Sequence, residues 1–217
     1  MALNPAWLTS NRARKYRGGI RSSWEGAIFQ NRVAIDPMAM TREWVARIVR
    51  RAFDLAEKGA GAPADRRRRV TCVDKSNVLR SFAFFRAIYD EAAQGHPHIE
   101  RQYMYADAMT QYMLFHPDRL NVVVTENFVG DMLSDLASAT VGGLGMARSA
   151  NLGDNKAMFE PVHGAAPDIA GKGIANPVAI LLACAYMLEW LDEKPASHLL
   201  RVQLRRSLKR GWSELQT

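Results

Sequence analysis

The sequence contains few cysteines, only Cys72 and Cys184 among 217 residues. They stand far apart, one in a strand-like run and one in an apolar helix-like run, and neither has a partner at metal-ligand spacing. The pattern gives no support for a cysteine metal site. It predicts a protein of a reducing compartment.

Long apolar runs are also lacking. The most apolar stretch, Pro177 to Leu191, is interrupted by Glu189 and is shorter than the roughly 20 residues of a membrane span. At the N-terminus, Arg12 and Arg14 are not followed by the apolar segment of a signal peptide. The sequence therefore predicts a cytoplasmic protein that does not cross a membrane.

The composition is that of a globular protein, with 48% hydrophobic and 24% charged residues. The net charge is +7, and the positive residues gather at Arg66–Arg69 and between Arg201 and Arg210. An arginine run without interleaved aromatic residues is more typical of a solvated loop than of a phosphate-binding patch. Leucines four residues apart in the tail predict a terminal amphipathic helix. A nucleic-acid-binding module is the least favoured function.

Strand-like and helix-like segments alternate along most of the chain, which predicts an α/β fold. After an irregular start, residues 1–35, and a helix capped by Thr41 and ending near Gly59, the expected elements are a strand at 70–73, a helix at 77–93, a strand at 99–105, a helix at 106–115, a strand at 121–125, a helix at 130–139 and an apolar helix from 177.

Two further expectations concern the core and the domains. Met109, Met113 and Leu114 are interpreted as core residues of their helix. Beyond Gly142 the composition shifts to small residues and loops, so we place a domain boundary near Thr140. The two domains are then 1–140 and 141–217.

The aspartates of the segment Thr125–Asp135 suggest a metal site. Asp131 and Asp135 are at positions i and i+4, so on a helix both carboxylates lie on one face and repel one another unless a cation neutralises them. Asp107 opens another helix, and three carboxylates form an all-oxygen ligand set that suits Mg²⁺ or Mn²⁺. The alternative for Asp131 is a capping role at a helix opened by Gly130.

Lys75 stands where a strand gives way to a helix, in Val73-Asp-Lys-Ser-Asn-Val78. Beside a bound cation, a lysine gives up its proton more readily and can act as a general base. The alternative is an exposed lysine after a strand.

The glycine-rich run His163–Pro177 has the features of a nucleotide-binding loop. Gly164, Gly171 and Gly173 permit close approach of the backbone, and Asp168 can accept hydrogen bonds from ribose hydroxyls. The same carboxylate would repel a 2′-phosphate, which favours NAD over NADP. The run is not a Rossmann fingerprint, and the alternative is a purely structural loop.

Together, the segments Asp74–Leu79, Asn127–Asp135 and Phe159–Pro177 resemble those of the β-decarboxylating dehydrogenases, the isocitrate/isopropylmalate dehydrogenase family. The likeness extends from about Arg14 to Leu191 and is nearest to the 3-isopropylmalate and tartrate dehydrogenase branch. It implies an isocitrate/isopropylmalate dehydrogenase-like fold that lacks the N-terminal half of the nucleotide domain. Residues 1–140 would form the central dimerisation, substrate and metal domain, and 141–217 the C-terminal segment of the NAD-binding domain.

The resemblance also implies roles for individual residues in the NAD-dependent and Mg²⁺- or Mn²⁺-dependent oxidative decarboxylation of a substituted malate. Asp131 and Asp135 would bind the metal together with Asp107 of the neighbouring subunit, and Lys75 of that neighbour would take the hydroxyl proton. Arg14 would bind a substrate carboxylate. The residues implied to contact NAD are Asn77, His163, Gly164, Asp168, Ile169 and Asn176. A shared site of this kind implies a homodimer.

Two departures from the family pattern support a different function. Arg21 stands where the family has a tyrosine that helps protonate the enol, and a guanidinium is a poor general acid. Family members also carry a longer segment before this point, which residues 1–11 cannot replace. The alternative is therefore a truncated, non-catalytic homologue that dimerises or binds nucleotide without turnover. A separate N-terminal half would be a further partner of the active form.

Overall fold

The computed structural model describes residues 6–9 and 38–210. Arg14 and Arg21 lie outside the described residues. The chain forms two compact units, residues 1–134 and 135–217, and helix α4 (Asn127–Thr140) contributes to both.

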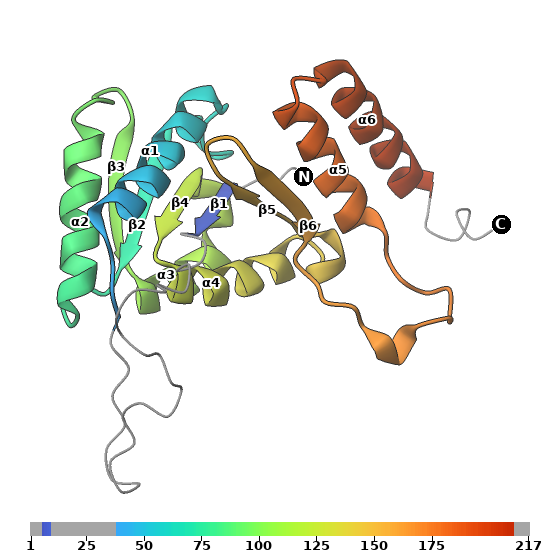
Figure 1. Cartoon of the computed structure of the whole chain (residues 1–217), viewed down its shortest axis with the longest axis horizontal. Helices are drawn as coiled ribbons and strands as arrows, with labels where there is room; N and C mark the ends of the chain where they lie inside the picture. Colours follow the sequence, from blue (N-terminus) through green and yellow to red (C-terminus); the bar gives the residue numbers. More distant parts are fainter. Residues whose placement is uncertain (1–5, 10–37, 211–217) are drawn as a thin grey trace, which may run out of the picture. The chain divides into compact units, whose positions relative to one another are not determined.

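The first unit contains a four-stranded parallel sheet with the strand order β1-β4-β2-β3 (Figure 1). Its strands are β1 (Ala6–Thr9), β2 (Arg69–Asp74), β3 (Glu100–Tyr105) and β4 (Val122–Thr125). The expectation that residues 1–35 are irregular is wrong for β1. Four residues are too few to show a period of two, and this strand forms through its pairing with β4.

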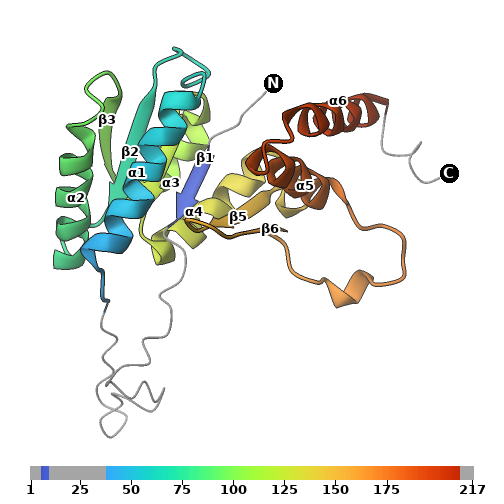
Figure 2. The same cartoon turned by 45° about the horizontal axis from the view of Figure 1, so that its top comes forward.

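Strands β2 and β4 lie in the middle of the sheet, and every residue of both is buried. Their continuous burial is typical of parallel strands that are covered on both faces. Helices α1 (Arg42–Lys58) and α2 (Arg80–Ala93) pack against each other and cover one face (Figure 2). The core residues of this layer are Val45, Val49, Ala52, Phe53, Phe85, Ile88, Tyr89, Val70, Cys72, Val122 and Val124.

Helix α3 (Ala106–Phe115) belongs to the opposite face of the sheet. In the strand order, the connection from β2 to β3 runs toward the β3 edge of the sheet, and the connection from β3 to β4 runs in the opposite direction. Because both crossovers are right-handed, their helices α2 and α3 lie on opposite faces. Met109 and Met113 of α3 are buried, as expected. Leu114 is 52% exposed, so its assignment to the core is wrong. It follows Met113 directly and therefore faces away from the buried side of α3.

Two helices begin at other residues than the periodicity predicts. Helix α2 starts at Arg80 rather than near Asn77, because the backbone amides of Val78 and Leu79 both donate to the carbonyl of Lys75 and form a turn there. Helix α4 starts at Asn127 rather than Gly130, because the Glu126 carboxylate accepts a hydrogen bond from the Phe128 amide and caps an earlier start. The cap that Thr41 provides for α1 is confirmed by its bond from the Trp44 amide.

The arginine run is only partly a solvated loop. Its first three residues are exposed, whereas Arg69 begins β2 with a side chain that is 7% exposed. This guanidinium donates to Asp65, to Glu100 and to the carbonyl of Arg119. A buried guanidinium needs such partners, and Arg69 thereby connects β2 to β3.

The second unit consists of an antiparallel pair, β5 (Arg148–Leu152) and β6 (Ala157–Pro161), with helices α5 (Val178–Trp190) and α6 (Lys194–Arg210). The sequence predicted loops where this hairpin lies. Its strands are short and only partly buried, so they leave no clear hydrophobic pattern in the sequence. Helices α5 and α6 pack together through the Ser197 hydroxyl, which donates to the carbonyl of Ala185. Among the described residues, no helix has the length and hydropathy of a membrane span.

Candidate active site

Lys75 and Asp107 come together at the carboxyl ends of β2 and β3. The two strands are parallel and their last residues, Asp74 and Tyr105, are paired, so the residues that follow them meet at the same edge of the sheet. The distance from Lys75 Nζ to Asp107 Oδ1 is 2.6 Å. Two residues that are far apart in the sequence thus form one charged pair.

The contact with Lys75 favours the ionised form of the Asp107 carboxyl group. The hydrogen bond from Lys75 is the main reason that the pKa of Asp107 lies below its ordinary value. The ammonium group also lies 5.7 Å from the centre of the Tyr105 ring. The side chain of Asp107 is 70% exposed and that of Lys75 is 30% exposed, so the pair is open to a ligand from solvent.

Asp131 and Asp135 lie one turn apart on α4, and both are exposed. Because α4 begins at Asn127, Asp131 stands inside the helix and does not cap it. Its carboxylate accepts one hydrogen bond, from the side-chain Nδ2 of Asn127 at 3.2 Å. Within the part of the chain that the structure describes, neither aspartate pairs with a cationic side chain. Two uncompensated carboxylates on one face suit a hard cation.

The third proposed ligand does not join these two in one chain. Among residues 6–9 and 38–210, no group of three or more histidine, cysteine or acidic side chains is placed to hold a metal ion. Asp107 instead contacts Lys75 of the same chain.

The run His163–Pro177 is an exposed loop that contains a short 3₁₀ helix, η3 (Pro167–Ile169). Its backbone adopts positive φ at Ala166 and at two glycines, with values of 46°, 75° and 66° at residues 166, 171 and 173. A Cβ atom at Gly164, Gly171 or Gly173 would contact nothing within 4 Å. The backbone of the loop is thus open to a ligand, and the glycines at 171 and 173 also serve its conformation.

The residues implied to contact NAD have different local environments. Asp168 is exposed and lies in η3 next to the half-buried Ile169. His163 lies at the start of the loop, with Nδ1 2.9 Å from the carbonyl of Gly164. Asn77 is exposed in the turn that follows Lys75.

Asn176 has a structural role that the sequence analysis did not identify. Its side-chain oxygen accepts a hydrogen bond of 2.9 Å from the Val178 amide, the first residue of α5. Its amide nitrogen lies 3.6 Å from the sulfur of Met146. Asn176 therefore fixes the end of the glycine-rich loop at the start of a helix.

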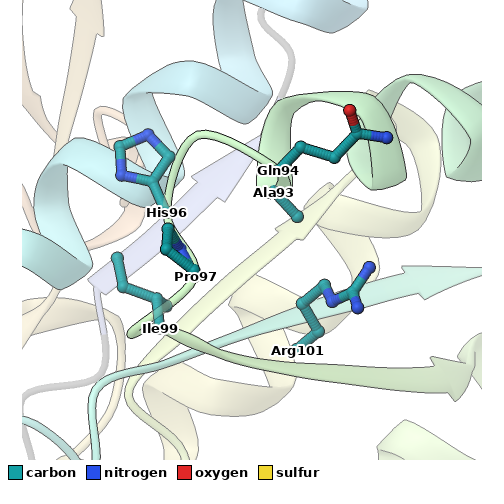
Figure 3. Close-up of a pocket in the computed structure, with 6 residues that line it drawn as sticks. All are labelled: Ala93, Gln94, His96, Pro97, Ile99 and Arg101. Carbon is teal, nitrogen blue, oxygen red and sulfur yellow. The ribbon is translucent and has the colours of Figure 1, made fainter.

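A cavity of about 210 Å³ lies away from these groups (Figure 3). It is lined by Ala93, Gln94, His96, Pro97, Ile99 and Arg101. These residues surround the amino end of β3, whereas Asp107 follows its carboxyl end. The His96 ring stacks on Phe53 and bonds to Glu57 of α1, so it already has partners. The cavity does not belong to the candidate site.

Comparison with known proteins identifies the family. Residues 13–214 match the family model of the isocitrate/isopropylmalate dehydrogenases. The chain belongs to this family. It is 40% identical to a 3-isopropylmalate dehydrogenase of Aquifex aeolicus over 92% of this chain and 54% of that protein. It is 44% identical to a homoisocitrate dehydrogenase of Methanocaldococcus jannaschii over 79% of this chain and 48% of that protein.

Solved structures show the same relationship. The isocitrate dehydrogenase from Methylococcus capsulatus is similar with a TM-score of 0.76 and 42% identity, over 82% of this chain and 51% of that one. The family membership and the isocitrate/isopropylmalate dehydrogenase-like α/β fold are thereby confirmed. The chain spans about half the length of these relatives.

Two residues beside Lys75 are not apparent as site residues from the sequence. Asp74 is fully buried and pairs with Arg86 of α2, and the Arg86 guanidinium lies over the rings of Tyr103 and Tyr105. A signal was present, because an aspartate at the end of a buried strand needs a cationic partner. The sequence could not identify which of the nearby arginines provides it.

Proposed function

We propose that this chain carries the metal-binding and base-providing part of a 3-isopropylmalate dehydrogenase-like enzyme. The reaction is the oxidative decarboxylation of a substituted malate with NAD and Mg²⁺ or Mn²⁺. The observation that carries the proposal is the contact of 2.6 Å between Lys75 Nζ and Asp107 Oδ1. It joins a candidate base to a candidate metal ligand in a member of a dehydrogenase family.

The residues have separate tasks in this reaction. Lys75 would take the proton of the substrate hydroxyl in the oxidation step, for which bound NAD would supply the hydride acceptor. Asp131 and Asp135 of one chain and Asp107 of a second chain hold the metal. The bound cation supplies Lewis-acid stabilisation of the negative charge that develops on the substrate oxygen. Arg14, which is outside the described residues, is proposed to bind a substrate carboxylate.

The glycine-rich loop is proposed to bind the adenosine part of NAD. Asp168 accepts hydrogen bonds from the ribose hydroxyls, and its negative charge disfavours the 2′-phosphate of NADP. The residues proposed to line this part of the site are His163, Gly164, Ile169 and Asn176, with Asn77 toward the nicotinamide. A fluorescence titration in which NADP binds more tightly than NAD would contradict the role of Asp168.

A second copy of the chain is part of the proposal. Among the described residues of one chain, no three acidic side chains are placed to hold a metal ion, so a three-carboxylate site is proposed to use Asp107 of a second chain. Helices α3 and α4 also carry exposed apolar side chains, Leu114, Phe115, Phe128 and Met132, which are 52%, 75%, 63% and 53% exposed. Exposed apolar side chains near a charged site are typical of an interaction surface.

The proposed reaction can be tested by supplying the part of the relatives that this chain does not match. The chain spans about half of the Aquifex aeolicus relative, so the N-terminal segment of that protein is fused to it or added in trans. We expect NADH formation from 3-isopropylmalate in the presence of Mn²⁺, and very little from the chain alone. Lys75→Met in the same fusion is the control, with an expected loss of about 10²-fold or more because the base is missing.

The contrasting result is a fused protein that is folded and binds NAD and Mn²⁺ yet forms no NADH from 3-isopropylmalate, tartrate or isocitrate. It would show that the chain is a non-catalytic homologue. Strong turnover by the chain alone would show that the added segment is not needed.

A further inference from the structure

Asp74 is a charged residue in a fully buried position. It is the last residue of β2, and its exposed fraction is 0%. Arg86 of α2 donates from Nε to Asp74 Oδ2 at 2.7 Å and from Nη2 to Oδ1 at 3.0 Å. A bidentate guanidinium–carboxylate pair is directional as well as strong, so it fixes the relative position of α2 and the end of β2.

The same carboxylate holds the backbone on which Lys75 stands. Asp74 Oδ1 also accepts a hydrogen bond of 2.9 Å from the Ser76 amide. The carbonyl of Lys75 accepts from the amides of Val78 and Leu79, at 3.0 and 2.9 Å. The backbone around Lys75 is therefore constrained on both sides, and one of the two constraints depends on the Asp74–Arg86 pair.

Arg86 is connected to the lysine by a second route, through an aromatic ring. Its Cζ lies 5.6 Å from the centre of the Tyr105 ring, and Lys75 Nζ lies 5.7 Å from the same centre. Tyr105 ends β3 directly before α3, the helix that carries Asp107. The Arg86 and Lys75 cations thus lie on the same Tyr105 ring. The chain continues from Tyr105 into the helix that carries Asp107, the ion-pair partner of Lys75.

The Lys75–Asp107 pair needs support of this kind. The side chain of Asp107 is 70% exposed, and an exposed pair held only by its own attraction contributes little because both side chains lose conformational freedom when they pair. Constraint of the lysine backbone and of the Tyr105 ring removes part of that entropic cost before the pair forms.

We propose that Arg86 is a positioning residue for Lys75. Through Asp74 it fixes the turn that carries the lysine, and through Tyr105 it fixes the surface on which the ammonium group lies, so that Nζ stays in contact with Asp107. The importance of Lys75 for turnover rests on the proposed function, but its position can be measured without turnover.

Carbodiimide cross-linking of the purified chain measures this position directly. The reagent activates a carboxylate, and an amine in contact with it forms an amide bond, so the yield of the Lys75–Asp107 link reports how often the two groups touch. Mass spectrometry of the digested protein gives that yield. The exposed pair Lys194–Asp192, at 2.7 Å, provides an internal reference in every sample.

We expect Arg86→Met to lower the Lys75–Asp107 yield, relative to the reference, by a factor of about 2 to 5. This factor corresponds to the free energy that an exposed ion pair typically contributes. Arg86→Lys retains the charge but not the bidentate geometry and should give an intermediate yield. The matched control is Arg42→Met. Arg42 makes an equivalent bidentate pair with Glu91, at 2.6 and 3.3 Å, on the surface of the same layer, and its loss should leave the yield unchanged.

The competing explanation is that Arg86 only stabilises the fold. In that case Arg86→Met lowers the melting temperature, and the yield at a temperature where the protein is fully folded equals that of the wild type. This result would overturn the proposal. Arg86→Met leaves Asp74 buried and unpaired, which can prevent folding. In that case the double variant Asp74→Asn/Arg86→Gln removes both charges together. A Lys75–Asp107 yield in the double variant equal to that of the wild type would again overturn the proposal.

Discussion

Asp131 and Asp135 place two negative charges on one face of α4 without a cationic partner in the described structure. If they bind Mn²⁺, replacing one charged ligand by an amide must weaken the site. We expect Asp135→Asn to lower the affinity for Mn²⁺ roughly tenfold or more in calorimetric titration. The control is Asp118→Asn, at an exposed aspartate of another element, η1 (Pro117–Arg119). Equal affinities for the wild type and Asp135→Asn would exclude Asp135 as a ligand.

Arg69 provides a pH-dependent part of the stability of the sheet. Its hydrogen bond is the main reason that the pKa of Glu100 lies below the ordinary 4.5. A carboxyl group with a lowered pKa in the folded state contributes stability above about pH 4.5 and loses it as the pH falls through the lowered value. We expect Arg69→Met to cost about 1–2 kcal/mol at pH 7, since solvent reaches both carboxylates that it contacts.

The same substitution should also flatten the dependence of stability on pH below 4.5. Urea unfolding at several pH values measures both effects. Arg67→Met is the matched control, because Arg67 is 69% exposed and lies 3.7 Å from the same glutamate. A pH profile of Arg69→Met that is parallel to that of the wild type would contradict this role.

At the scale of single elements, Asn176 connects the glycine-rich loop to α5 through its bond to the Val178 amide. We expect Asn176→Ala to lower the free energy of unfolding by about 1 kcal/mol, as loss of one side-chain hydrogen bond to the backbone does. Asn176→Asp keeps an accepting oxygen and should retain most of this stability. Hydrogen exchange of the Val178 amide measures this bond directly. If the Val178 amide of Asn176→Ala exchanges as slowly as that of the wild type, the role of Asn176 in holding the start of α5 is wrong.

The same pair of variants separates the structural role of Asn176 from nucleotide binding. Asn176→Asp is expected to keep the bond to the Val178 amide and to change NAD affinity, because a carboxylate replaces the side-chain amide. Asn176→Ala is expected to change both properties. If the two variants bind NAD with the same affinity as the wild type, Asn176 is only a structural residue.

The sequence predicted best those elements that have a strong period and a single buried face. Helix α1 has both, and its boundaries at Thr41 and Gly59 agree with the structure. The starts of α2 and α4 differ from the predicted ones by three residues. A turn closed on the Lys75 carbonyl, next to the bond from the Ser76 amide to Asp74, delays α2, and the Glu126 carboxylate caps an earlier start of α4. A side-chain oxygen that competes for a backbone amide is local in its effect and leaves no trace in the hydrophobic period.

The sequence indicated which residues belong to the candidate site but not which of them contact one another. Motifs identified Lys75 and Asp107 as candidate residues, and the parallel pairing of β2 with β3 explains why they meet. No single segment indicates that pairing, because it depends on the strand order of the whole sheet. For the same reason the sequence could not assign Arg86 to Asp74, although both charges are present in it.

At the scale of the whole molecule, the chain matches about half the length of its relatives and forms two compact units. The first unit holds the candidate base and the first of the paired metal ligands, and the second holds the glycine-rich loop. Both functions can therefore be measured separately, as Mn²⁺ binding and as NAD binding, before any turnover is sought. A variant that loses one of these two binding activities and keeps the other separates the metal site from the glycine-rich loop.

Assembly and metal binding should be lost together if a second chain provides Asp107. Phe115 and Phe128 are 75% and 63% exposed on α3 and α4, and placing a charge in an apolar interface is costly. We expect the wild type to sediment with about twice the mass of the 24.3 kDa chain, and Phe115→Glu/Phe128→Glu with the mass of one chain. The monomer should bind Mn²⁺ roughly tenfold or more weakly, because one carboxylate ligand is missing.

The control for assembly is Leu199→Glu, at a residue of α6 that is 59% exposed in the second unit. It should leave both the mass and the metal affinity unchanged. A monomeric Phe115→Glu/Phe128→Glu that binds Mn²⁺ as tightly as the wild type would mean that α3 and α4 form the interface but that Asp107 does not complete the metal site. A wild-type chain that is monomeric yet binds Mn²⁺ tightly would place all the ligands in one copy, and the shared-site proposal would then be wrong.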